Sequence, residues 1–245
     1  MPAFKDHFSG HAPDYARFRP GYPDALFDLL TSLADRRELA VDVGSGSGQA
    51  ALPLAERFGR VVATDASGSQ LRHAPGALSR LVCLAERLPL RDGSADLITV
   101  AQALHWLDVE RFGAEARRVL RPGGILAVWT YRWFRMEPPF AEAVTRFYAR
   151  VAPCWPPERA LVESGYATLP LPGEPVPVPL LAMRDRWPLA AVAGYLRTWS
   201  ATKRFSARHG EDPVAEFERD AGGLDAVGPD GLAVEWDLVV RVMRV

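Results

Sequence analysis

The sequence predicts an α/β fold, a doubly wound, mostly parallel sheet of seven strands with helices on both faces. Short apolar runs alternate with helical stretches along the chain, which is the order of elements in such sheets. The runs contain few internal polar residues, as expected of strands that helices cover on both sides. A turn with glycine at every second position, 44–48, follows the first run and ends it sharply.

The elements can be assigned in order along the chain. A helix over 22–33 has Pro23 in its first turn and apolar residues on one side. Further helices are expected over 49–58, 188–200 and 213–221, and one more before the Arg-Pro-Gly-Gly turn at 121–124. The apolar runs predict strands at 39–43, 61–64, 81–84, 97–101, 125–130, 180–187 and 234–243.

The chain of 245 residues is expected to form a single domain over 1–245 with a substantial core. A segment of about 1–22, ahead of the first strand, is expected to cover the site. Residues of about 131–179 form an insertion between the fifth and sixth strands. The proline-dense end of this insertion, 170–179, predicts an extended connection.

The composition argues against several classes of function. The formal net charge is −1 and there is no run of Lys or Arg, so a nucleic-acid partner is disfavoured. No long apolar run occurs and the N-terminus lacks the apolar region of a signal peptide, which predicts a cytoplasmic protein without membrane contact. Cys83 and Cys154 lack the spacing of metal ligands, so no metal site is expected.

The turn after the first strand indicates the kind of ligand. Asp42 precedes Gly44, Gly46 and Gly48, and a strand that ends this way brings backbone N–H groups close to a ligand. Dinucleotide-binding folds place a third glycine or alanine three residues after the second, where this chain has Gln49. The difference favours S-adenosylmethionine (SAM), whose amino acid end has no pyrophosphate.

A second acidic residue, Asp65, ends the next apolar run about 20 residues further on, at the usual distance in a βαβ unit. Its carboxylate can accept hydrogen bonds from both hydroxyls of an adenosine ribose. Asp65 could instead cap the next helix. This residue does not separate SAM from NAD, because both contain the same ribose.

Four further segments carry a resemblance to a known family. They are Phe-Ser-Gly-His to Tyr-Pro at 8–23, Ala-Gln-Ala-x-His-Trp at 101–106, Arg-Pro-Gly-Gly at 121–124, and Tyr-Leu-Arg-Thr-Trp-Ser at 195–200. With the glycine turn, they make the chain resemble the class I SAM-dependent methyltransferases. More narrowly, it resembles the small-molecule branch that includes trans-aconitate methyltransferase-like proteins. The resemblance implies SAM as cofactor, S-adenosylhomocysteine as product, a small-molecule acceptor, and a last strand inserted antiparallel between the fifth and sixth.

The resemblance also implies roles for individual residues. The glycine turn contacts the methionine part of SAM, Asp65 the ribose, and Ala85 with Glu86 the adenine. Family members often carry an aspartate before that Ala-Glu pair, where this chain has Leu84. The full set of candidate cofactor contacts is Tyr15, Arg19, Asp42, Gly44, Ser45, Gly46, Gly48, Gln49, Asp65, Ala66, Gln70, Ala85, Glu86, Ala101, Gln102 and His105.

His105 and Tyr15 are the candidate catalytic residues. His105 follows the fourth strand, where donor and acceptor should meet, and near-neutral titration would suit it as a base or as a donor that orients the acceptor. It could also be purely structural. In the resembling family the N-terminal segment folds over the cofactor, so Tyr15 could lie near the sulfonium and Arg19 near a carboxylate. Alternatively, Phe18, Arg19 and Tyr22 could simply pack this segment onto the sheet.

Aromatic residues are frequent from the fifth strand onward. Trp129 and Trp187 lie in predicted strands and are expected in the core. Trp133, Phe134 and Trp155 lie in the insertion and could wall an acceptor pocket, which would suit an apolar or flat acceptor.

The expected function is transfer of the SAM methyl group to a small organic acceptor, a carboxylate or a hydroxyl. A general base is needed only if the acceptor enters protonated. One alternative is an NAD(P)-dependent oxidoreductase, which Gln49 disfavours. Another is a non-catalytic SAM-binding protein, because methyl transfer needs no single indispensable side chain. The acceptor itself and the choice between monomer and homodimer do not follow from the sequence.

Overall fold

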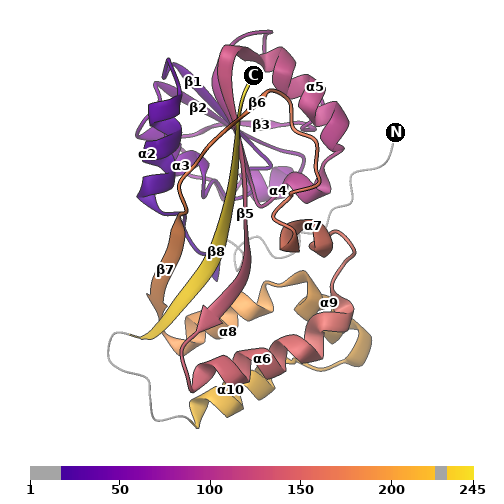
Figure 1. The fold of residues 1–245 in the computed structure, drawn as a ribbon. Coiled ribbons are helices and arrows are strands. Elements are labelled where there is room, and N and C mark those ends of the chain that lie inside the picture. Colours follow the sequence, from indigo (N-terminus) through magenta and orange to yellow (C-terminus); the bar gives the residue numbers. More distant parts are fainter. Residues whose placement is uncertain (1–17, 224–230) are drawn as a thin grey trace.

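The computed structural model describes residues 18–223 and 231–245. Its centre is an eight-stranded sheet in the order β3-β2-β1-β4-β5-β8-β6, with β7 also paired to β8 (Figure 1). The strands are β1 Leu39–Val43, β2 Arg60–Asp65, β3 Ser79–Val82, β4 Ala95–Ala101, β5 Leu120–Met136, β6 Glu174–Val176, β7 Ala182–Trp187 and β8 Leu232–Arg244. Strands β1 to β5 are parallel to one another, and β8 pairs antiparallel with β5, β6 and β7. The predicted α/β fold with a mostly parallel sheet is confirmed.

Helices cover both faces of the sheet (Figure 1), with a separate apolar core under each face. Leu26 and Leu54 belong to the core under α2 and α3, whereas Phe112 and Val162 belong to the core under α5 and α7. None of the helices in the described ranges is long and apolar enough to cross a membrane. The helices are α2 Asp24–Leu33, α3 Ala51–Ala55, α4 Gly68–Leu71, α5 Val109–Val119, α6 Phe140–Val151, α7 Arg159–Glu163, α8 Leu189–Arg197, α9 Ser200–His209 and α10 Val214–Gly222, with the short 3₁₀ helices η2 Leu104–Trp106 and η3 Ala152–Cys154.

The last strand, β8, lies between β5 and the outer edge of the sheet, as the family resemblance implied. That edge is split, because β6 pairs with residues 242–244 of β8 and β7 pairs with residues 232–237. The strand predicted at 180–187 corresponds to β7. The seven predicted strands become eight because the extended connection 170–179 contains the short β6.

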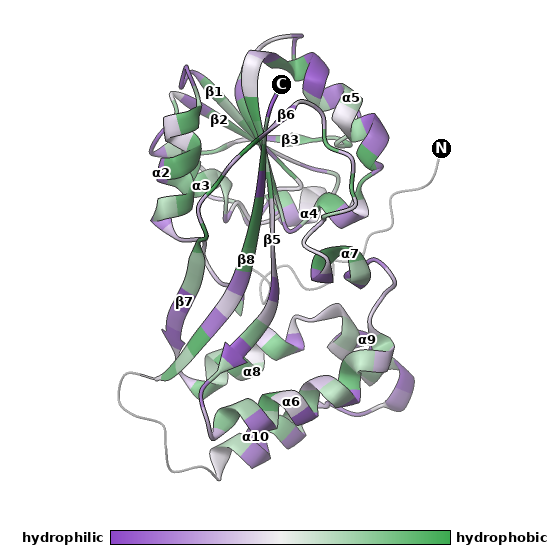
Figure 2. Ribbon diagram, in the orientation of Figure 1, coloured by the Kyte–Doolittle hydropathy of each residue, from purple (hydrophilic) through white to green (hydrophobic). Residues whose placement is uncertain are grey.

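Strands β5, β7 and β8 extend past strands β1 to β4 toward a second group of helices (Figure 1). Strand β5 continues beyond its predicted end at residue 130 because residues 131–136 keep pairing with residues 234–238 of β8. Helices α6, α8, α9 and α10 lie at this end, and we call them the helical layer. Hydrophobic and hydrophilic stretches alternate along α6 and α10 (Figure 2), and the rings of Phe147 and Phe217 meet between these two helices at 6.2 Å.

Two elements near the glycine turn differ from the prediction. Helix α3 is Ala51–Ala55 instead of 49–58, because residues 44–50 form the turn itself. Strand β3 is Ser79–Val82, two residues earlier than the predicted 81–84. The prediction followed the apolar residues, whereas the position of this edge strand is set by its pairing with β2.

The helical layer was only partly predicted. The helix expected over 188–200 is α8, which ends at Arg197, and a second helix, α9, begins at Ser200 after Trp199, whose ψ of 138° is extended. No helix was assigned to 140–151, although Phe140, Val144 and Phe147 recur at helical spacing and are buried in α6. The predicted helix 213–221 corresponds to α10.

Candidate functional site

The glycine turn between β1 and α3 has a backbone that side chains disfavour. Gly44, Gly46 and Gly48 have φ values of +67°, +56° and +85°, in the left-handed region. A Cβ on Gly44 would lie 2.6 Å from the Cβ of Ala103. At Gly46 the nearest atom would be Gln70 Oε1, at 3.9 Å, so this glycine leaves open space in front of the turn.

The open space is a cavity of about 530 Å³ at the carboxyl edge of β1, β2 and β4. We call it the larger cavity. The predicted cofactor contacts that line it are Gly44, Ser45, Gly46, Gln49, Asp65, Ala66, Gln70, Ala85, Glu86, Ala101, Gln102 and His105. Asp42 and Gly48 are not among its lining residues, and Arg19 lines a neighbouring cavity instead. Tyr15 lies outside the described residues.

Asp65 joins the glycine turn to the end of β2. Its Oδ2 accepts a hydrogen bond from Gly46 N at 2.9 Å, and its Oδ1 accepts one from Ser67 N at 2.8 Å. The N-cap residue of α4 is Ser67, so Asp65 is not the helix cap that the sequence left open. Asp65 also lines the larger cavity, and its contact with a ribose stays a prediction.

Asp42 lies beneath the turn and is completely buried. Its Oδ1 accepts a hydrogen bond from Thr99 Oγ1 at 2.8 Å, which ties β1 to β4. Burial raises the pKa of Asp42 to about 6, against the opposing effect of the Ser45 and Thr99 hydroxyls, and the charge of Asp65 raises it further. Asp42 therefore supports the turn from behind.

The segment expected to meet the adenine is tied to the start of α5. Glu86 Oε1 accepts a hydrogen bond from Asp108 N at 2.9 Å. Glu86 and Leu84 both line the larger cavity, and Leu84 stands where the resembling family often has an aspartate. This part of the cavity wall is consequently less acidic than the family pattern implies.

Gln102 follows β4 and has a φ of +54°, which is unusual for a residue with a side chain. Its Nε2 donates to Tyr131 O at 3.0 Å, and the Thr130 hydroxyl donates to its Oε1. These contacts fix Gln102 against β5. Gln102, Tyr131, His105 and Trp106 line both the larger cavity and a second, smaller cavity, so the two cavities meet at these side chains.

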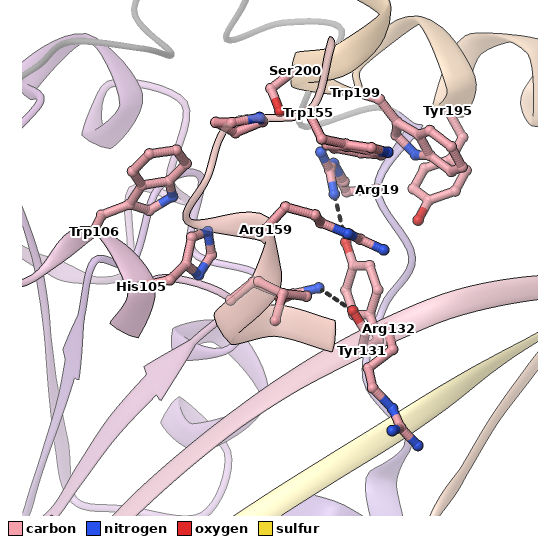
Figure 3. A pocket seen from close by; sticks show the side chains of 13 residues that line it. Arg19, His105, Trp106, Tyr131, Arg132, Trp155, Arg159, Tyr195, Trp199 and Ser200 are labelled. Atoms are coloured by element: carbon pink, nitrogen blue, oxygen red, sulfur yellow. Dashed lines mark hydrogen bonds between the residues drawn. The ribbon is translucent and has the colours of Figure 1, made fainter. Parts of the chain in front are cut away.

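The smaller cavity has a volume of about 70 Å³ and lies between the sheet and the helical layer (Figure 3). Its walls include aromatic rings and guanidinium groups, and none of its described lining residues carries a carboxylate. The lining residues are Arg19, Gln102, His105, Trp106, Tyr131, Arg132, Trp155, Pro156, Arg159, Val162, Tyr195, Trp199 and Ser200.

Two of the three arginines direct their charge into this space (Figure 3). Arg19 Nη1 donates to the Tyr131 hydroxyl at 2.9 Å. The Arg159 guanidinium lies 4.5 Å from the centre of the Trp155 ring, and its Nε pairs with the half-exposed Glu163 at 3.2 Å. The Arg132 guanidinium points away in Figure 3, toward Asp237 of β8 at 3.9 Å.

His105 lies on η2 at the junction of the two cavities. Its Nδ1 is 2.8 Å from the hydroxyl of Tyr166. Burial lowers the pKa of His105 to about 3, and the charges of Arg159 and Arg19 lower it further. The near-neutral titration expected from the sequence is therefore wrong, and His105 is uncharged at neutral pH.

The aromatic residues of the insertion divide between site and core. Trp155 lines the smaller cavity, as predicted for a pocket wall. Phe134 is buried in the core, and Trp133 packs edge-on against Tyr148 with ring centres 3.9 Å apart. Trp129 is fully buried, as expected. Trp187, which was also predicted to lie in the core, is partly buried and packs against the apolar core that contains Trp129.

Several lining residues were not predicted as site residues. Tyr195, Trp199 and Ser200 belong to the 195–200 segment that carried part of the family resemblance, so that motif was an available signal. Arg159 lies in a stretch without a recognisable motif. It reaches the site only because α7 packs beside η2 and β5.

The larger cavity fits SAM. Its volume lies within the usual range of about 300–1,000 Å³ for small-ligand sites. The Ser47 hydroxyl is buried beside the turn without a hydrogen-bond partner among the described residues, as expected where a polar ligand completes the site. The open face of Gly46 would admit the methionine part.

Comparisons with known proteins show the family of the chain. A methyltransferase domain model matches residues 41–128. A Dictyostelium discoideum protein whose name describes it as a methyltransferase is 31% identical over 228 residues, which is 88% of this chain and 84% of that protein. A solved structure described as a type II methyltransferase from Anaeromyxobacter dehalogenans is 44% identical with a TM-score of 0.82, and the match covers 93% of this chain and 98% of that one.

An uncharacterized methyltransferase of Mycobacterium bovis is 45% identical over 122 residues, 48% of this chain and 49% of that protein. These relatives do not test the narrower resemblance to trans-aconitate methyltransferase-like proteins, which stays a prediction.

Proposed function

The chain belongs to the class I SAM-dependent methyltransferases, and from this premise we propose that it methylates a small organic acid bound in the smaller cavity. SAM occupies the larger cavity in this proposal. Its methionine part lies at the glycine turn, its ribose at Asp65, and its adenine beside Ala85 and Glu86. The methyl group then faces the junction formed by Gln102, His105 and Tyr131.

The observation that carries the choice of acceptor is the charge of the smaller cavity. Arg19 and Arg159 both line it, and none of its described lining residues is acidic. A carboxylate would be held by these guanidinium groups through charge-assisted hydrogen bonds. The rings of Trp155, Tyr195 and Trp199 would pack against the flat or apolar remainder of the molecule.

The state of His105 also favours a carboxylate over a hydroxyl. A pKa of about 3 makes His105 a weak base at neutral pH, so it is poorly suited to remove a proton from an acceptor. A carboxylate enters already ionised and needs no base. Bound SAM would supply an activated methyl group, whose transfer to a carboxylate oxygen forms an O–CH₃ bond, breaks the S–CH₃ bond and leaves a neutral thioether.

The chain's own contribution is then position and exclusion of water. Gln102, fixed by two side-chain hydrogen bonds to β5, and Tyr131 line the junction at which the two ligands would meet. The helical layer closes the smaller cavity from the other side through Tyr195 and Trp199. Such an arrangement holds the acceptor oxygen close to the methyl carbon, which is the main requirement of an in-line transfer.

The proposal is tested with labelled SAM and matched sets of small molecules, each set comprising an aromatic or unsaturated acid, its amide and its alcohol. We expect the acids to form methyl esters, which mild alkali converts back to the acids. Methylation of the amides or alcohols but not of the acids would contradict the proposed acceptor class. Calorimetry with S-adenosylhomocysteine and NADH on the same preparation separates this function from that of an oxidoreductase.

Arg159→Gln provides a test of the acceptor site within the chain. We expect the KM for the acid to rise by about ten- to a hundredfold, because a hydrogen bond to a charged group contributes about 1.5–3 kcal/mol. The affinity for S-adenosylhomocysteine should stay unchanged, since Arg159 does not line the larger cavity. Arg208→Gln, at an exposed position on α9, is the matched control. An equal KM in the two variants would show that Arg159 does not bind the acceptor.

A further inference from the structure

Tyr166 is a fully buried residue with a strained backbone next to the site. Its φ is +60°, and the only other described non-glycine residue with a positive φ is Gln102, which lies at the junction of the two cavities. This backbone conformation is strained for a residue that carries a side chain, and such strain concentrates at functional sites. The structure must therefore hold Tyr166 in place from elsewhere.

Strand β8 supplies that support. Gly165, also at positive φ (+63°), packs so closely that a Cβ there would lie 2.9 Å from Val239 Cγ1. Arg241 Nη1 donates to the carbonyl oxygen of Tyr166 and, at 2.9 Å, to that of Leu169. The turn that carries Tyr166 is thus attached to β8 through Val239 and Arg241.

At its other end Tyr166 contacts His105. The phenol oxygen is 2.8 Å from His105 Nδ1, and the two rings are stacked with centres 5.9 Å apart at an interplanar angle of 27°. His105 Nε2 makes no hydrogen bond to the described residues, and His105 lines both cavities. Holding Nδ1 against Tyr166 leaves Nε2 as the ring nitrogen that can meet a ligand.

We propose that Tyr166 is a positioning residue for His105: its hydroxyl donates to Nδ1, keeps the proton on Nε2, and presents Nε2–H to the acceptor's carboxylate. This inference rests on the proposed function, because it needs an anionic acceptor at the junction. His105 then acts as an uncharged hydrogen-bond donor and not as a base. It orients the carboxylate oxygen that is not methylated, while Arg19 and Arg159 supply the positive charge.

Chemical shifts of the His105 ring nitrogens test the tautomer without any turnover. In the protein saturated with S-adenosylhomocysteine, ¹⁵N spectra should show a protonated Nε2 and an unprotonated Nδ1, with the resonance assigned by its loss in His105→Gln. A protonated Nδ1 would overturn the proposal. Comparable populations of the two tautomers would overturn it as well, because Tyr166 would then not fix the position of the proton. Because no acceptor is present, this result stands even if the acceptor class is wrong.

Kinetics test whether the tyrosine acts through the histidine. Tyr166→Phe keeps the ring and removes only the hydroxyl, so we expect kcat for the acid to fall about three- to tenfold with unchanged affinity for S-adenosylhomocysteine. In a His105→Gln background the same change should have no further effect. Tyr148→Phe, which loses a phenol bonded to Glu163 at 3.1 Å, is the matched control.

Additive losses in the double variant, or an undiminished kcat in Tyr166→Phe, would show that Tyr166 is only structural. Absence of acid methylation by the unaltered protein would instead contradict the proposed function and leave the tautomer result to be judged by the spectra alone.

Discussion

Asp42 and Asp65 were both singled out by their spacing from the glycine turn, yet burial gives them different properties. Asp65 lines the larger cavity and bonds to the backbone of the turn. Asp42 is completely buried, and its pKa rises from 3.8 to about 6 because a buried carboxylate loses its hydration. A raised pKa has a direct consequence for the dependence of stability on pH.

The folded protein binds the Asp42 proton more tightly than the unfolded chain does. Between about pH 4 and pH 6 the unfolded state therefore carries fewer protons at this group, and the free energy of unfolding falls as the pH rises, by about 3 kcal/mol in total. The side chain in Asp42→Asn cannot titrate, so the free energy of unfolding of this variant should lack the pH-dependent fall that Asp42 causes. Urea unfolding of both proteins should show the variant gaining stability relative to the unaltered protein from about pH 4 to about pH 7. Parallel pH profiles would mean that Asp42 has an ordinary pKa.

Single residues were predictable where a local pattern fixes them. Gly46 and Asp65 are close in space because β1 and β2 are neighbouring parallel strands, and that follows from the alternation of strands and helices. Arg159 and Tyr166 were not predictable, since each reaches His105 through packing between distant elements. The residues that would bind SAM therefore follow from the sequence more readily than those that would bind the acceptor.

At the scale of elements, one arginine of α5 holds residues 88–92, which follow Ala85 and Glu86 of the larger cavity wall in the sequence. Arg118 donates to the carbonyl oxygens of Leu88 and Leu90 at 3.0 and 2.8 Å, and it pairs with Asp92 at 2.6 Å. Glu115 on the same helix accepts from Leu88 N and pairs with Arg118. These contacts fix residues 88–92, which follow Ala85 and Glu86 in the sequence.

Arg118→Ala should weaken the binding of S-adenosylhomocysteine about tenfold, because the released segment must be ordered again when the ligand binds. The KM for the acceptor should change little, since none of these residues lines the smaller cavity. Calorimetric titration measures the first quantity and steady-state kinetics the second. The neighbouring, exposed Arg117→Ala is the control, and similar affinities in the two variants would show that the segment is fixed without Arg118.

At the scale of the whole molecule, the class of sheet and the place of its last strand could be predicted, but the helical layer only in part. The antiparallel insertion of the last strand followed from family resemblance, and the structure bears it out. The length of β5 did not follow, because residues 131–136 become strand only through their partners in β8, about 100 residues away. That extension places α8 and α9 opposite the sheet and creates the smaller cavity between them.

Because the two cavities have mostly different walls, we expect the two ligands to protect different parts of the chain from amide hydrogen exchange. The larger cavity is lined mostly by the ends of the parallel strands, including the segments 43–50, 64–67 and 83–87. The smaller cavity is lined by residues of 155–162, which lead into α7, and by residues of 195–200, which belong to the helical layer. S-adenosylhomocysteine alone should therefore slow amide hydrogen exchange in the first set. An acid that is methylated should slow exchange in the second set only when added with it.

The comparison needs four samples: the protein alone, with each ligand, and with both. An inert amide analogue of the acid serves as the control, because it lacks the charge that Arg19 and Arg159 would bind. Protection of 155–162 and 195–200 by S-adenosylhomocysteine alone would contradict the separation, since the wall of the smaller cavity would then respond to the cofactor. Equal protection by the acid and its amide would contradict recognition of the carboxylate.

The separation is expected because the two cavities share few side chains. Of the described residues, both cavities are lined by Gln102, His105, Trp106 and Tyr131. Most of each cavity wall would therefore touch only one ligand.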